Sequence, residues 1–152
     1  TLGAYFGYTK VMSEIHKDFP ELDYLRDTLF YIANKKYHKE KDDLPRLLAL
    51  SDYMQTDYHD LWPKGKVTAR PQFSEKYPKN VLVFVNNNKQ LPRLVMYRNS
   101  FAKSLLHYFS EHFSRSVYFW SHKVNVKTAM NEKPNIVILQ VSEALIDDLL
   151  TI

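Results

Sequence analysis

Hydrophobic residues recur at helical spacing at the start of the chain and again beyond residue 100. The apolar side chains of Leu2–Ile15 repeat every three or four residues, which predicts a helix that ends before Pro20. A second helical stripe covers Phe101–Phe113. Shorter helices are predicted over Val126–Glu132 and over Ser142–Leu150, which would close the chain.

Short apolar runs alternate with these helices and predict strands at Val81–Val85, Leu94–Tyr97, Val117–Trp120 and Ile136–Val141. The last run is almost wholly apolar, as is typical of a strand buried on both faces. Strands that alternate with helices favour right-handed crossovers and a parallel sheet covered on both sides. The pattern therefore predicts one α/β domain over residues 1–152.

The region before these strands is less regular. Asp43 and Pro45 are typical of a helix start, and leucines follow them. The charged run Lys35–Asp43 predicts a solvated loop or helix end. Residues 51–79 are polar, aromatic and interrupted by prolines, so we expect a loop with short strands there.

Composition narrows the possible chemistry. The 152 residues are 45% hydrophobic and 14% aromatic, enough to fill one core. The net charge is +4, but basic and acidic residues are interspersed, so we expect no nucleic-acid partner. Cysteine is absent, which excludes disulfides and thiolate sites, and the sequence shows no Gly-rich phosphate loop, signal peptide or membrane-length apolar run. The chain begins with Thr1 inside periodic sequence, so we expect it to be part of a longer protein.

The segment Arg98-Asn99-Ser100-Phe101 joins a predicted buried strand to a predicted helix. A serine there stands at the carboxyl edge of the sheet, where open α/β folds bind ligands. Free N–H groups near Phe101 could hold an oxyanion, as acyl transfer through a serine ester requires. The residues alone leave a second interpretation open, in which Ser100 or Asn99 only caps the helix. Arg98 could anchor a carboxylate or sugar acid, or belong to a structural ion pair.

A candidate general base lies earlier in the chain. Asp57 and His59 are two residues apart, so on an extended segment they share one side. Asp57 could orient His59, which could take the proton of Ser100. The alternative is a loop histidine beside a carboxylate. His107 and His112 are five apart, which does not fit a helical zinc pair, and we expect no metal ion and no organic cofactor.

Several stretches are similar to a known family. "LPRLVMYRNSFAKSLLHYFSEHFSRSVYFW" resembles the strand, Asp-Ser-Phe and helix of SGNH-hydrolase-like domains of the alginate O-acetylation type. "EKPNIVILQVSEALIDDL", "TLGAYFGYTKVMSEIHKDFP" and "DDLPRLLALSD" extend the resemblance. It implies a flavodoxin-like three-layer parallel sheet, incomplete in this chain. Asn99 stands where the family has Asp, and the family's Asp-x-His-Trp motif would lie immediately before Thr1.

The resemblance implies a bacterial serine O-acetyltransferase or acetylesterase that modifies a cell-envelope or exported polysaccharide, in the periplasm or outside the cell. Ser100 would form the acyl-enzyme, with a His–Asp pair from upstream or from His59 and Asp57. Phe101, Arg98 and Asn99 would contact the oxyanion or substrate. The expected partners are a polysaccharide or acetylated sugar, a membrane-associated acetyl donor protein and a second copy of the chain. The alternatives are a catalytically inactive SGNH-like binding or scaffold module, and an unrelated α/β domain.

Overall fold

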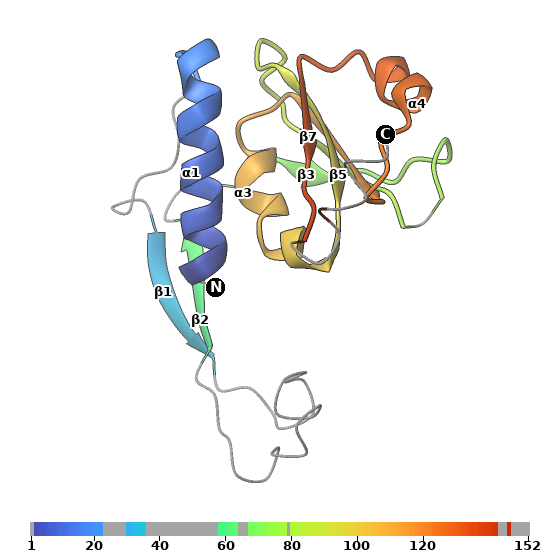
Figure 1. Ribbon diagram of the computed structural model, residues 1–152. Helices are drawn as coiled ribbons and strands as arrows, with labels where there is room; N and C mark the ends of the chain where they lie inside the picture. Colours follow the sequence, from blue (N-terminus) through green and yellow to red (C-terminus); the bar gives the residue numbers. More distant parts are fainter. Residues whose placement is uncertain are drawn as a thin grey trace, which may run out of the picture.

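A five-stranded sheet organises the computed structural model (Figure 1). The structure describes residues 2–22, 30–35, 58–63, 67–78, 80–142 and 146. The strands stand in the order β3-β4-β6-β5-β7. Their bounds are β3 Arg70–Pro71, β4 Leu82–Val85, β5 Arg93–Arg98, β6 Arg115–Trp120 and β7 Ile136–Leu139.

Three neighbouring strands are parallel, as the sequence predicts, because β5 pairs in parallel with both β6 and β7. The other two strands differ from the expectation: β4 is antiparallel to β6, and β3 is antiparallel to β4. The physical reason is the short connection over residues 86–92 between β4 and β5. A parallel return needs a crossover of about a dozen residues or more, so this short loop reverses the chain instead.

Helices cover both faces of the sheet. α1 (Leu2–Asp18) and α4 (Val126–Asn131) form where the periodicity predicts them. The predicted helix after β5 is broken into a 3-10 helix, η3 (Ser100–Ser104), and a short α-helix, α3 (Leu106–Ser110). A 3-10 helix has three residues per turn, so Phe101 leaves the apolar stripe and is 76% exposed.

Two apolar cores result. The first joins α1, η3 and α3 to one face of the sheet, and its buried members include Tyr8, Met12, Leu94, Met96, Ala102, Leu106, Phe109 and Tyr118. The second lies on the face that α4 covers, with Val83, Val95, Tyr97, Val117, Phe119 and Ala129. The expected three layers are therefore present. The expectation that the last strand is buried on both faces is wrong, because β7 stands at the sheet edge and Val137 is half exposed.

A separate antiparallel pair, β1 (Phe30–Lys35) and β2 (Tyr58–Pro63), packs beside α1 (Figure 1). β2 and β3 confirm the short strands expected within residues 51–79. The predicted helix that begins near Asp43 lies outside the described residues, as does nearly all of the predicted helix Ser142–Leu150. No helix in the described part of the chain is long and apolar enough to cross a membrane.

Candidate active site

The connections after β5 and β6 leave the sheet in opposite directions. After β5 the chain enters η3 and α3, which pack on the α1 face, whereas after β6 it enters α4 on the other face. Ligands of open α/β sheets usually bind beyond the carboxyl ends of the parallel strands. At this edge of the sheet lie Arg98–Ser100 after β5 and Trp120 and Ser121 after β6.

Hydrogen bonds from both neighbouring strands hold the backbone of this corner. The Asn99 amide donates to Gln140 Oε1 at 2.9 Å, and the Gln140 amide donates to the Tyr97 carbonyl at 2.9 Å. On the other side, the Ser121 amide donates to the Arg98 carbonyl at 3.1 Å. The residues before Ser100 are therefore fixed from two sides, as preorganised chemistry requires.

Asn99, and not Ser100, caps the 3-10 helix. Asn99 Oδ1 accepts a hydrogen bond from the Phe101 amide at 3.0 Å. Ser100 is the first residue of η3 and is exposed, and its hydroxyl makes no hydrogen bond within the described part of the chain. The sequence left open which residue caps the helix. With Asn99 in that role, the Ser100 hydroxyl is available to a substrate or a base.

The same cap changes the expected role of Phe101. The sequence predicts an oxyanion site at the free N–H groups near Phe101, and of these groups the Phe101 amide donates to Asn99 Oδ1. This one donor can hold an oxyanion only after the cap breaks. The exposed Phe101 ring instead stands beside Ser100 at the surface.

Arg98 is a buried cation without a carboxylate partner among the described residues. Only 3% of the residue is exposed. Its Nη1 donates to the Asn99 carbonyl at 3.2 Å, and its guanidinium carbon lies 4.8 Å from the centre of the Trp120 ring. Its buried Nε has no hydrogen-bond acceptor there. Burial lowers the pKa of the guanidinium, and the nearby Tyr118 partly opposes this. Of the two roles expected for Arg98, the structural ion pair is therefore not found among these residues.

The predicted internal base stays a prediction. Asp57 lies outside the described residues. His59 lies in β2, opposite Asn34 of β1, and its strand contacts α1. His59 itself lies in an extended strand, and the shared-side argument for Asp57 and His59 stays a prediction.

A cavity of about 520 Å³ lies on the face of the sheet that α4 covers. Its walls include aromatic side chains from the sheet and polar side chains around α4, among them Tyr77, Tyr97, Phe119, Trp120, Asn125 and Asn131. The sequence gave no signal for this cavity, because the lining residues come from separate parts of the chain.

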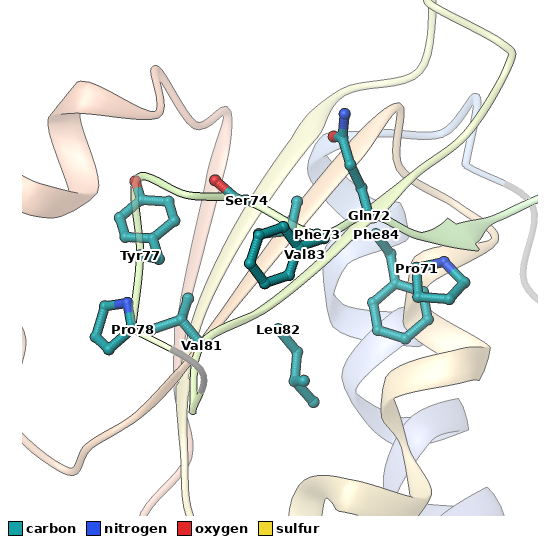
Figure 2. Close-up of a pocket in the computed structure, with 10 residues that line it drawn as sticks. All are labelled: Pro71, Gln72, Phe73, Ser74, Tyr77, Pro78, Val81, Leu82, Val83 and Phe84. Carbon is teal, nitrogen blue, oxygen red and sulfur yellow. The ribbon is translucent and has the colours of Figure 1, made fainter.

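A second pocket, of about 350 Å³, lies along β3 and β4 and shares Tyr77, Pro78 and Val81 with the first cavity. Figure 2 shows its lining, in which Phe73 lies close to Val83 and Pro71 lies close to Phe84. It includes no residue of the Ser100 corner. In the described ranges, no group of three or more histidines or acidic residues could hold a metal ion.

The amino ends of the strands carry a charged cluster that the sequence did not reveal. Glu132 is 4% exposed and accepts from Arg115 Nε at 2.7 Å and from Arg93 Nη2 at 3.2 Å. Lys76 Nζ and the Tyr77 hydroxyl also donate to it, at 2.8 and 2.6 Å. Burial raises the pKa of Glu132, but the hydrogen bonds from Arg115, Lys76 and Tyr77 outweigh it and bring the pKa to about 2.

No protein-family model and no curated protein matches the chain. Solved structures do match. A DHHW family protein from Eubacterium siraeum has a TM-score of 0.64 and 9% identity, over 90% of this chain and 54% of that one. Bacillus cereus PatB1, solved with a sulfonyl adduct, has a TM-score of 0.60 and 15% identity, over 90% of this chain and 55% of that one. The chain thus spans about half the length of these neighbours and shares their α/β fold.

Proposed function

We propose that Ser100 is the nucleophile of an SGNH-type O-acetyltransferase or acetylesterase that acts on a cell-envelope or exported polysaccharide. One observation carries the proposal: an exposed serine with an uncommitted hydroxyl stands beyond the carboxyl end of a parallel strand, on a backbone held from both sides. The fold shared with PatB1 supports it, because acyl transfer through a serine ester on such a fold needs a nucleophile at this edge of the sheet.

A histidine must take the proton of Ser100. Asp57 and His59 are one source, and residues directly before Thr1 in a longer protein are the other.

The proposed reaction runs in two steps. Ser100 Oγ attacks the carbonyl carbon of the donor acetyl ester while the histidine takes its proton, and the ester oxygen leaves with that proton. An acceptor sugar hydroxyl, or water, then attacks the acetyl-serine, and Ser100 leaves and regains its proton. The charge of Arg98, two residues away, favours the negative tetrahedral intermediates because no carboxylate among the described residues neutralises it.

The test compares two serines of the same 3-10 helix in the full-length protein. We expect Ser100→Ala to lower the hydrolysis of 4-nitrophenyl acetate by about 10³-fold or more, because removal of a catalytic-triad member has effects of this size. Ser104→Ala, at the other end of η3, should leave the rate unchanged. Equal rates for the wild type and Ser100→Ala would exclude the proposed nucleophile.

The second candidate function is a non-catalytic binding module that keeps the fold. The capped Phe101 amide favours it, because this expected oxyanion donor is already engaged, and so does Asn99 in place of the family's Asp. This candidate predicts that neither serine variant changes the ester hydrolysis, and that the protein still binds a glycan.

A further inference from the structure

The cavity beside α4 has an aromatic wall built by three neighbouring rings. Tyr97 stacks on Phe119 with 5.1 Å between ring centres and 20° between planes. Tyr77 meets the edge of Phe119 at 5.3 Å. Trp120, the next residue of β6, also lines the cavity and is half exposed, and its ring lies against Arg98. Tyr97 and Phe119 are buried behind the wall, so Tyr77 and Trp120 supply the exposed ring surface, on which the C–H faces of a sugar ring can stack.

Polar groups around this wall fall into two sets. The Tyr97 hydroxyl donates to the Asn125 carbonyl at 2.8 Å, and Asn125 Oδ1 accepts from the Thr128 amide at 2.9 Å, so these groups shape the cavity. In contrast, the side chains of Asn80, Asn131 and Lys123 line the cavity and make no hydrogen bond within the described part of the chain. They are exposed and available to a ligand's hydroxyl groups.

The size and position of the cavity also fit a ligand site. A volume of about 520 Å³ lies within the range of about 300–1,000 Å³ that is typical of ligand sites. Trp120 lines the cavity, and its ring also lies against Arg98, whose Nη1 binds the Asn99 carbonyl. A continuous line of contacts therefore leads from the residue beside Ser100 to the cavity.

We propose that this cavity is a saccharide subsite, which holds a sugar unit of the acceptor polymer next to the unit that reacts at Ser100. Trp120 provides the stacking face, and Asn80, Asn131 and Lys123 bind the hydroxyl groups. The inference rests on the proposed function for the link to Ser100. Saccharide binding itself does not require catalysis, so it is tested separately.

The binding test fills the cavity from α4. Asn131→Trp places a bulky ring in the cavity from an exposed position, and Met130→Trp adds the same bulk one residue earlier, outside the lining. The full-length wild type is titrated with a panel of tri- to hexasaccharides of neutral, amino and uronic acid sugars, by calorimetry. We expect at least one to bind, Asn131→Trp to weaken that binding at least tenfold, and Met130→Trp to leave it unchanged.

A second variant keeps the result independent of folding effects at α4. Trp120→Phe retains a smaller ring and should weaken the same saccharide about three- to tenfold. Binding of no panel member, or equal binding by Asn131→Trp and wild type, would overturn the subsite.

Ser100→Ala distinguishes this inference from the proposed function. Unchanged saccharide binding by Ser100→Ala, together with lost ester hydrolysis, supports both. If the wild type hydrolyses the ester through Ser100 but binds no saccharide, the subsite fails and the nucleophile stands. If saccharide binds at Asn131 but Ser100→Ala hydrolyses ester as wild type does, the subsite stands and the catalytic proposal fails.

Discussion

The two ends of the parallel strands differ in whether a buried charged side chain has an oppositely charged partner. At the amino ends, Arg93 and Arg115 share the buried carboxylate of Glu132, which Lys76 also contacts. At the carboxyl ends, Arg98 is about as buried as Glu132, and among the described residues it has no carboxylate partner but contacts the Asn99 carbonyl and the Trp120 ring. A buried ion needs a partner to offset its loss of hydration.

The difference indicates that the two ends serve different purposes. At the amino ends one buried carboxylate is paired with three cations that donate hydrogen bonds to it. The carboxyl ends hold a buried cation without a carboxylate partner among the described residues, and an uncommitted serine hydroxyl. Ligands of open α/β folds bind at the carboxyl ends, so we interpret this imbalance as the place where a substrate completes the structure.

The largest predicted effect is at the amino ends. Glu132→Gln removes the charge that three cations share, and we expect the free energy of unfolding to fall by about 3–5 kcal/mol. Urea denaturation followed by circular dichroism measures it. The control is Glu14→Gln, whose ion pairs on α1 are exposed, and it should change stability little. Similar effects of both variants would contradict the stabilising role of the buried Glu132 cluster.

The Glu132 cluster also predicts that the free energy of unfolding depends on pH. The pKa of Glu132 is about 2 in the folded protein, below its ordinary value of 4.5. Its contribution to stability is therefore complete above about pH 4.5 and is lost as the pH falls towards 2. We expect the stability difference between wild type and Glu132→Gln to shrink over that interval. A difference that stays constant from pH 6 to pH 2.5 would contradict the charged role of Glu132.

A smaller effect is predicted at the corner itself. Asn99→Ala removes the cap on the Phe101 amide and should lower the free energy of unfolding by about 1 kcal/mol. Asn99→Asp retains a capping oxygen and restores the residue of the resembled family, so it should retain the wild-type stability. Thermal unfolding of both variants measures the difference. If Asn99→Ala and Asn99→Asp have equal stabilities, the Asn99 cap does not stabilise the start of η3.

The smallest effect should have the opposite sign. Arg98→Met removes a buried cation that has no carboxylate partner among the described residues, and we expect stability to rise by about 0.5–1 kcal/mol while ester hydrolysis falls. Arg93→Met is the matched control at the amino ends. It should lower stability, because Glu132 loses a partner. Destabilisation by both variants would show that Arg98 serves the fold and not the site.

Local pattern was sufficient to predict much of the fold. The helices α1 and α4 and the strands β4 to β7 follow from periodicity and apolar runs, because each depends mainly on its own residues. The antiparallel direction of β4 and the edge position of β7 do not. They depend on which strands pair across the sheet, and a single sequence carries little information about that pairing.

In the candidate site, too, some features follow from the local sequence and others depend on the folded chain. The Ser100 corner was predictable, because a strand, a polar turn and a helical stripe follow one another along the chain. That Asn99 caps η3 depends on local backbone geometry, and it changes the meaning of both Ser100 and Phe101. The cavity and the Glu132 cluster join residues far apart in the sequence, so only the folded chain brings them together.

The most direct test of the central claim is covalent labelling of Ser100. Full-length protein is treated with phenylmethylsulfonyl fluoride, which reacts with activated serines, and is digested with trypsin. Cleavage after Arg98 and Lys103 releases Asn99–Lys103, in which Ser100 is the only serine. We predict that mass spectrometry finds the sulfonyl group on this peptide and not on the next one, which begins with Ser104. An unmodified Asn99–Lys103 peptide from folded protein would contradict an activated nucleophile at the carboxyl ends of the strands.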